Sequence, residues 1–113
     1  MLIDRDKKEI DLIKNTAMQV FENNIEFGEF KEFDSPYSQF DWFVRLYGTI
    51  DAILVYDRSI LTMGIIKDGE EIYIGEYTNK PIVRGFASTE PENLLANFRV
   101  LDDVAKKMRD EQL

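Results

Sequence analysis

Apolar and polar residues alternate along the middle of the chain in short runs, separated by residues that favour turns. Alternation with a period of two is typical of β-strands buried on one side, so residues 41–87 are expected to form an antiparallel β-meander. The expected strands are residues 41–47, 50–57, 60–66, 70–77 and 82–87. The rest of the chain is expected to pack around this meander.

An Asp-Gly pair at residues 68–69 separates two of these runs. It favours a two-residue hairpin turn, because both central residues of that turn must tolerate positive φ. Such a turn places Ile65 opposite Ile72, with both side chains on one face of the sheet. It places Tyr73 on the other face, over the bare backbone of Gly64. A slip of one residue would turn the isoleucines outward, so this register is strongly specified.

A second turn is expected at Gly48, since glycine suits the first central position of a type II′ turn. This two-residue turn would pair residues 41–47 with residues 50–57. In that register the side chains of Trp42 and Val44 lie on the same face as those of Ile53 and Val55. The Asp-Arg-Ser segment at residues 57–59 is a weaker turn signal ahead of the next run.

Residues 25–33 are the most ambiguous segment. Ile25 and Phe27 alternate as in a strand, but Phe30 has the opposite parity. A bulge at Gly28 would return this aromatic side chain to the inner face, so we expect an irregular strand at the edge of the sheet. Acidic residues on an edge discourage unwanted pairing with other strands. The three that fit this role are Glu26, Glu29 and Glu32.

A helix is predicted over residues 4–22, because its apolar residues recur at three- and four-residue spacing. Asp4 or Asp6 would cap its start, and Asp6 with Glu9 resembles a capping pair. Leu12 and Met18 lie off the main apolar stripe. They either widen the buried face or contact a second chain.

A second helix is predicted over residues 90–110 on the same spacing. Thr89 and Glu92 have the separation of a capping box, and Pro91 lies in the first turn, where its missing N–H costs nothing. The elements together predict one domain of the α+β class. It is expected to be a four- or five-stranded antiparallel β-meander with N- and C-terminal helices packed on one face.

The composition removes several kinds of chemistry. The sequence contains no cysteine and no histidine, which excludes thiol catalysis, Cys-ligated metals and the commonest general base. The adjacent carboxylates of Asp102 and Asp103 diverge on a helix, and the glycines do not follow the strand–loop–helix order of a phosphate site. We therefore expect a protein that is not an enzyme, with no catalytic residues, no metal site and no cofactor.

The net charge of −8, from 22 acidic and 14 basic residues, points to the kind of partner. Direct binding to nucleic acid or to an anionic membrane needs cationic surface, whereas an acidic protein favours a partner with a basic face. Solubility alone would also explain the charge. The first residues do not resemble a secretory signal, and no run approaches the roughly 18 apolar residues of a membrane span. A soluble, cytoplasmic protein is expected.

Acidic and aromatic residues are concentrated in the same stretch, residues 22–57. It has eight acidic residues against two basic ones and nine of the fourteen aromatic residues, more than one face of two strands can hide. Some of the aromatic side chains are therefore expected at a protein–protein interface. The loop at residues 34–39 would present Tyr37, because binding residues concentrate on loops. The candidate partner-binding residues are Glu26, Glu29, Glu32, Asp34, Tyr37 and Asp41.

Three functions fit these observations. The leading hypothesis is a small acidic inhibitor, of an immunity or anti-defence type, whose carboxylates stand in for phosphates and bind a nucleic-acid-handling protein. The alternative is a homodimeric chaperone or assembly factor that buries Leu12, Met18 and exposed aromatic residues against a twin or a client segment. The third is a small-molecule-binding or catalytic domain that uses tyrosines and carboxylates in a cleft.

Overall fold

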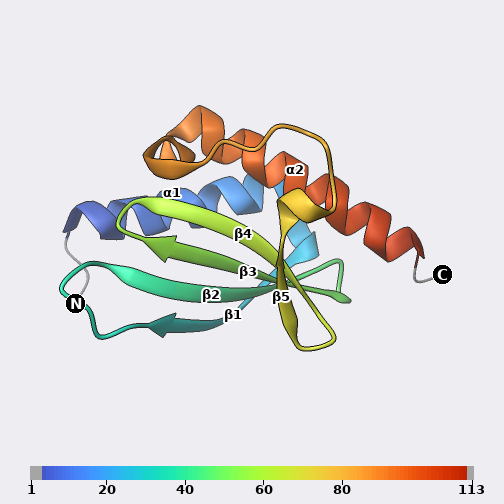
Figure 1. Ribbon diagram of the computed structural model, residues 1–113, viewed down its shortest axis with the longest axis horizontal. Helices are drawn as coiled ribbons and strands as arrows, with labels where there is room; N and C mark the ends of the chain where they lie inside the picture. The colour runs from blue at the N-terminus through green and yellow to red at the C-terminus, as the bar shows by residue number, and fades with distance from the viewer. Residues whose placement is uncertain (1–3, 112–113) are drawn as a thin grey trace.

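A computed structural model describes residues 4–111 of the protein, and it has the expected α+β architecture (Figure 1). The strands are β1 (Ile25–Glu32), β2 (Gln39–Leu46), β3 (Ile50–Asp57), β4 (Ile60–Lys67) and β5 (Glu70–Tyr73). They form one antiparallel sheet in the order β1-β2-β3-β4-β5, so each strand pairs with its neighbour in the sequence. Helices α1 (Asp4–Phe21) and α2 (Pro91–Glu111) lie on one face of this sheet.

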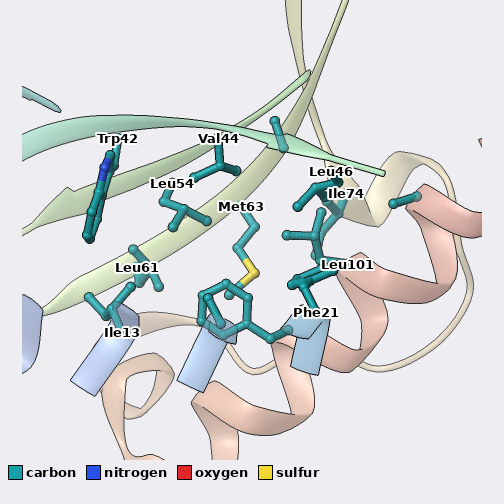
Figure 2. Packing of buried hydrophobic residues seen from close by; sticks show 14 of the residues in the cluster. Ile13, Phe21, Trp42, Val44, Leu46, Leu54, Leu61, Met63, Ile74 and Leu101 are labelled. Atoms are coloured by element: carbon teal, nitrogen blue, oxygen red, sulfur yellow. The ribbon is translucent and has the colours of Figure 1, made fainter. Parts of the chain in front are cut away.

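The core fills the space between the sheet and the two helices, as the apolar stripes of both helices require. Ile13 and Phe21 from α1 and Leu101 from α2 face the inner side chains of β2, β3 and β4 (Figure 2). The sequence left open whether Leu12 widens the buried face of α1 or contacts a second chain. In the structure its side chain packs against the core and so widens the buried face. Met18 on the same helix is 47% exposed.

The β4–β5 hairpin has the expected register, with Ile65 opposite Ile72 and Gly64 opposite Tyr73. The prediction that the Tyr73 ring covers Gly64 is wrong. A Cβ added at Gly64 would meet the Ile53 side chain at 3.3 Å, whereas a Cβ added at Gly75 would lie 2.3 Å from the Tyr73 ring. The strand ends at Tyr73 and the chain turns into a 3-10 helix (Ile74–Glu76), so the ring folds onto the following glycine.

The β2–β3 hairpin differs from the expectation by one residue. Leu46 pairs with Ile50, so the turn has three residues, and its first two, Tyr47 and Gly48, have φ of 53° and 70°. As a result Leu54 lies on the inner face opposite Trp42, and Ala52 lies there opposite Val44, in place of the predicted Val55 and Ile53. Residues 52–56 are apolar without interruption, so the sequence alternation could not decide which parity faces the core. The pairing of β3 with β4 shows which residues of β3 face the core, because the inner residues of β4 align with the even-numbered residues of β3.

Two further predictions concern the edges of the sheet. The irregularity in β1 is confirmed, since the register shifts between Phe27 and Phe30 and leaves one extra residue in β1. The last expected strand, residues 82–87, is wrong: this segment holds a 3-10 helix (Gly85–Thr89) preceded by irregular chain. The Asn97 side chain binds both main-chain groups of Val83, at 3.0 Å each, and so takes the place of a strand partner.

The start of α2 also differs from the expected cap. Glu90 is the residue before α2, and its main-chain oxygen accepts from the Leu94 N–H at 2.8 Å. Pro91 is therefore the first helical residue, as expected. The Thr89 hydroxyl, expected in a capping box, instead donates to the main-chain oxygen of Ser59 at 2.9 Å. It ties the start of α2 to the β3–β4 turn.

Candidate functional site

The acidic segment of the chain forms one open edge of the sheet. β1 pairs with β2 on one side only, so its other side has no strand partner. Glu26, Glu29 and Glu32 all lie on this strand and are exposed. The extra residue in β1 kinks the edge, and a kinked, charged strand resists pairing with a strand of another protein. Side-chain contacts, and not backbone pairing, are therefore what this edge offers a partner.

Two of the five candidate carboxylates face basic side chains on the helix-free side of the sheet. Glu26 is opposite Arg45, which forms an ion pair of 2.9 Å with Asp51 on the next strand. Asp51, and to a smaller degree Glu26, raise the pKa of Arg45. Asp41 is opposite Lys31; partial burial raises the pKa of Asp41, while the charge of Lys31 lowers it. These two carboxylates are thus partly neutralised within the sheet.

The other three carboxylates extend around the edge to the β1–β2 loop. Glu29 lies in the kinked part of β1 and Asp34 in the loop, and both side chains are exposed. No ion pair among residues 4–111 includes either of them. Glu32 is opposite Phe40, whose side chain is buried in the core, so Glu32 lies on the helix side of the edge. The six predicted residues therefore lie on the edge strand, its loop and the start of β2, and do not form one flat patch.

Tyr37 is the exposed aromatic residue of this loop, with 55% of its surface accessible. The guanidinium of Arg58 lies 4.9 Å from the centre of its ring, a distance typical of a cation–π contact. Arg58 also binds Asp57 at 3.1 Å, and its main-chain N–H donates to the Ser38 oxygen at 3.1 Å. These contacts hold the β1–β2 loop against the β3–β4 turn and present the tyrosine ring to solvent.

Most aromatic residues of the acidic segment belong to the core. Phe40, Trp42 and Tyr56 are buried, and Phe27 and Phe30 pack against the first two with centroid distances of 4.5–5.3 Å. Within this segment, Tyr37 is therefore the main aromatic side chain that remains exposed. The most exposed aromatic side chain of the described residues lies elsewhere, at Phe86, and is 71% accessible.

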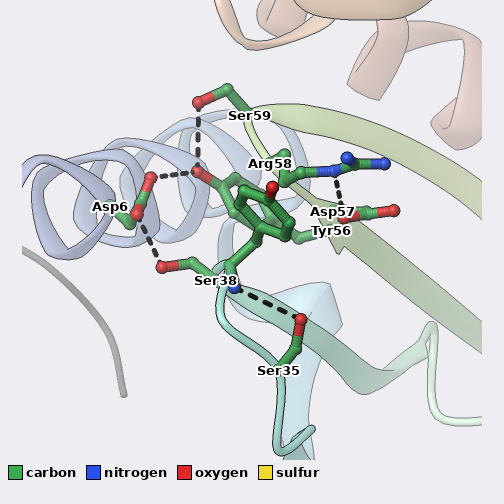
Figure 3. A network of polar contacts seen from close by, with 8 residues as sticks. Asp6, Ser35, Ser38, Tyr56, Asp57, Arg58 and Ser59 are labelled. Atoms are coloured by element: carbon green, nitrogen blue, oxygen red, sulfur yellow. Dashed lines mark hydrogen bonds and ion pairs between the residues drawn. The ribbon is translucent and has the colours of Figure 1, made fainter.

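A buried polar cluster that was not predicted from the sequence joins α1 to the sheet (Figure 3). The Asp6 carboxylate accepts from the Ser38 hydroxyl at 2.6 Å and from the Tyr56 hydroxyl at 2.7 Å. Glu9 accepts from the same Tyr56 oxygen at 2.7 Å and from Ser59 at 3.0 Å. Asp6 and Glu9 thus make contacts with residues far away in the chain, and the cap expected at the start of α1 adjoins residues outside the described range. Burial, followed by these carboxylates, raises the pKa of Tyr56.

A second group of side-chain contacts joins the β2–β3 turn to α2. The Tyr47 hydroxyl donates to the carboxylate of Asp102, which also pairs with Lys106 at 3.0 Å. Arg109 lies over the tyrosine ring at 4.6 Å. Burial and the hydrogen bond to Asp102 raise the pKa of Tyr47. The Asp102 side chain is therefore largely covered.

Three further findings concern metal binding, membrane-spanning helices and similarity to known proteins. No group of three or more acidic side chains in the described range could hold a metal ion. Neither helix is long and apolar enough to cross a membrane, over the part of the chain that the structure describes. No protein-family model matches the chain, and no curated protein or solved structure is matched by it either.

Proposed function

We propose that the protein is a non-enzymatic binding protein that presents the β1 edge and the β1–β2 loop to a partner with a basic surface. The observation that carries this proposal is the position of Glu29 and Asp34. Glu29 is exposed on the unpaired edge strand and Asp34 on the loop that follows it, and no described ion pair includes either of them. Carboxylates in this state are available to a cationic partner without breaking an internal contact.

Tyr37 supplies the second element of the interface. Interfaces gain most of their affinity from a few aromatic or arginine anchors, with charged residues around them. The exposed ring of Tyr37 lies on the same loop as Asp34 and is held in place by Arg58. We infer that the ring is the anchor and that the carboxylates steer the partner toward it.

The excess of acidic over basic residues in this part of the chain supports a nucleic-acid-handling partner. Such a partner has a surface that binds phosphates, and an excess of carboxylates can bind to the same cationic groups. By this proposal the protein occupies that surface and inhibits the partner, and the encounter takes place in the cytoplasm. Electrostatic steering would raise the association rate by about 10- to 1,000-fold at low salt.

The test compares two charge-reversal variants in affinity capture from a host lysate. The edge variant carries Glu29→Lys and Asp34→Lys, and the control variant carries Glu71→Lys and Glu76→Lys. All four side chains are exposed, and the two variants have the same net charge. We expect the wild type and the control to retain the same basic protein at low salt and to release it at high salt. The edge variant should fail to retain it; equal capture by both variants would contradict the proposal.

The acidic edge has a second possible role, which the same variants separate from partner binding. If Glu29 serves only to keep β1 from pairing with other chains, the edge variant should capture the same proteins as the wild type. The charge at the edge would then matter only for self-association. Sedimentation of the wild type and the edge variant measures that effect directly.

A homodimeric chaperone or assembly factor is the second candidate, and the observation that favours it is the exposure of Met18 on α1. Methionine is common on surfaces that bind varied clients. Leu12 does not extend this surface, because it packs against the core. A stable dimer in sedimentation experiments without any partner, lost on Met18→Lys, would support this candidate over the acidic binding protein.

A further inference from the structure

The face of the sheet that points away from both helices has an apolar row across its middle. The strand ladders align Phe43 with Ile53, and Ile53 with Gly64. The residues on either side of them in each strand point into the core, so this row points the other way. Both helices lie on the opposite side of the sheet (Figure 1). Phe43, Val55 and Ile66 are partly exposed on this side, which we call the outer face.

Charged residues flank the apolar row of the outer face at equal distances. Arg45 and Asp41 each lie two positions from Phe43 along β2. On β1, Glu26 is directly opposite Arg45, and Lys31 is directly opposite Asp41. The four charges therefore form a rectangle with opposite signs at neighbouring corners, and Phe43 lies midway along one side of it. The rectangle has no net charge, so it offers little to a basic partner.

This alternating arrangement is complementary to itself. A two-fold axis that runs along the apolar row would bring the outer face of a second copy onto the first, with the strands of the two sheets nearly aligned. The rotation exchanges the two ends of each strand and leaves β2 over β2. Arg45 then faces Asp41 of the second copy, and Glu26 faces Lys31 of the second copy. Opposite charges thus surround an apolar centre in which Phe43 faces its own equivalent.

The outer face also has room for the side chains of a second copy. A hollow of about 390 Å³ lies beside Phe43 and is bordered by Glu26, Arg45, Asp51 and Ile66. A ring from the second copy can enter this hollow, so the two sheets can interdigitate as stacked sheets do. The Nε of Arg45 donates to Asp51 at 2.9 Å. A guanidinium has further N–H donors on its terminal nitrogens, which remain for a carboxylate of the second copy.

The size of the outer face sets the strength of this contact. Strands β1 to β4 have eight residues each, so the four span roughly 500 Å² at the usual spacings of a sheet. A stable interface covers about 800 Å² on each partner, so the pairing should be reversible. We propose that the outer face binds a second copy of this chain in a two-fold dimer, centred on Phe43 and held by Arg45 of each copy on Asp41 of the other.

The test measures dimerisation of the purified protein by sedimentation equilibrium from about 10 μM to 1 mM, at about 0.15 M salt. Arg45→Asp and Asp41→Arg should each weaken the dimer by at least tenfold, because like charges then face each other. An equimolar mixture of the two variants should recover the affinity of the wild type, since every substituted side chain faces its opposite charge in the mixed dimer. Arg99→Asp makes the same charge change at an exposed position on α2 and should leave the dimer unchanged.

Several results would overturn the proposal. A wild type that stays monomeric at about 1 mM would do so, and so would a mixture of folded variants that does not recover the affinity. A dimer that survives Arg45→Asp but is lost on Met18→Lys would belong to α1 instead.

Nuclear magnetic resonance of the wild type provides a measurement that needs no substitution. On concentration, the amide resonances around Phe43 should shift and those of α1 should not; the reverse would overturn the proposal. Because these experiments use the purified chain alone, their failure would leave the proposed function of the acidic edge unaffected.

Discussion

Tyr56 and Asp6 are fifty positions apart in the chain and are joined by a buried hydrogen bond of 2.7 Å. The same hydroxyl contacts Glu9 at 2.7 Å, so a single tyrosine on β3 connects the sheet to two carboxylates of α1. Asp6 is 1% exposed. Buried carboxylates are costly unless they are hydrogen-bonded, so this contact should contribute strongly to the attachment of α1.

We expect Tyr56→Phe to lower the free energy of unfolding by about 1–3 kcal/mol, because Asp6 and Glu9 lose a shared donor. Urea denaturation measures this change. Tyr77→Phe is a matched control, since the Tyr77 hydroxyl is buried and has no hydrogen-bond partner among the described residues. Its removal should be neutral or stabilising. A larger loss for Tyr77→Phe than for Tyr56→Phe would contradict this view of the cluster.

The raised pKa values of Tyr47 and Tyr56 predict that the protein loses stability in alkaline solution. Above pH of about 10 a tyrosine in the unfolded chain releases its proton, while the folded protein retains it. The folded state then binds more protons, so the free energy of unfolding falls by about 1.4 kcal/mol per pH unit for each tyrosine. Urea denaturation between pH 9 and 11 tests this slope, and Tyr47→Phe or Tyr56→Phe should each remove one part of it. If the slope were unchanged in both variants, Tyr47 and Tyr56 would not be the cause of the alkaline loss of stability.

Much of the fold followed from the sequence where local signals were strong. The Asp-Gly turn at residues 68–69 determined the β4–β5 register, and Phe30 with its reversed parity indicated the bulge in β1. The β2–β3 register could not be determined in this way, because residues 52–56 are apolar throughout and either parity satisfies the core. Only the pairing of β3 with β4 excludes one of the two possibilities.

Long-range contacts explain why the candidate site was predicted only in part. The sequence located the acidic edge, because charge density is a local property. It did not reveal that Asp6 binds Ser38 and Tyr56, or that Asn97 replaces a strand partner for Val83. These side chains lie far apart in the chain, and their residue types are equally compatible with helix caps or exposed positions.

Because the Tyr73 ring lies close to Gly75, we expect a Gly75→Ala substitution to destabilise the protein only when the ring is present. A Cβ at Gly75 would lie 2.3 Å from the Tyr73 ring, so Gly75→Ala should displace the ring and lower the free energy of unfolding by roughly 1–3 kcal/mol. In a Tyr73→Ala background the same change should be nearly neutral, because the clash is absent. Chemical denaturation of the four proteins in this cycle gives the coupling energy. If Gly75→Ala lowered the free energy of unfolding equally with and without the Tyr73 ring, a clash with the ring would not be the reason for the loss.

The kink in β1 should keep the sheet edge from pairing with other molecules. Deletion of Gly28 removes the one residue by which β1 exceeds β2 between Phe27 and Phe30, and so restores regular pairing. A straight edge strand is a template for another strand, so we expect the deletion variant to self-associate. Sedimentation velocity measures this, with circular dichroism as the control for intact secondary structure. A folded variant that remains monomeric would contradict this role of the kink.

The acidic edge as a binding surface is tested most directly by a photo-reactive residue placed at position 37 and, as a control, at position 76. Position 37 is at the exposed tyrosine of the β1–β2 loop, and Glu76 is exposed beyond β5. Irradiation in host lysate should attach one basic protein to position 37 at low salt, and much less at high salt, since screening weakens the attraction. Adducts that are the same at both positions, or that do not change with salt, would contradict the claim that this edge recognises a basic partner.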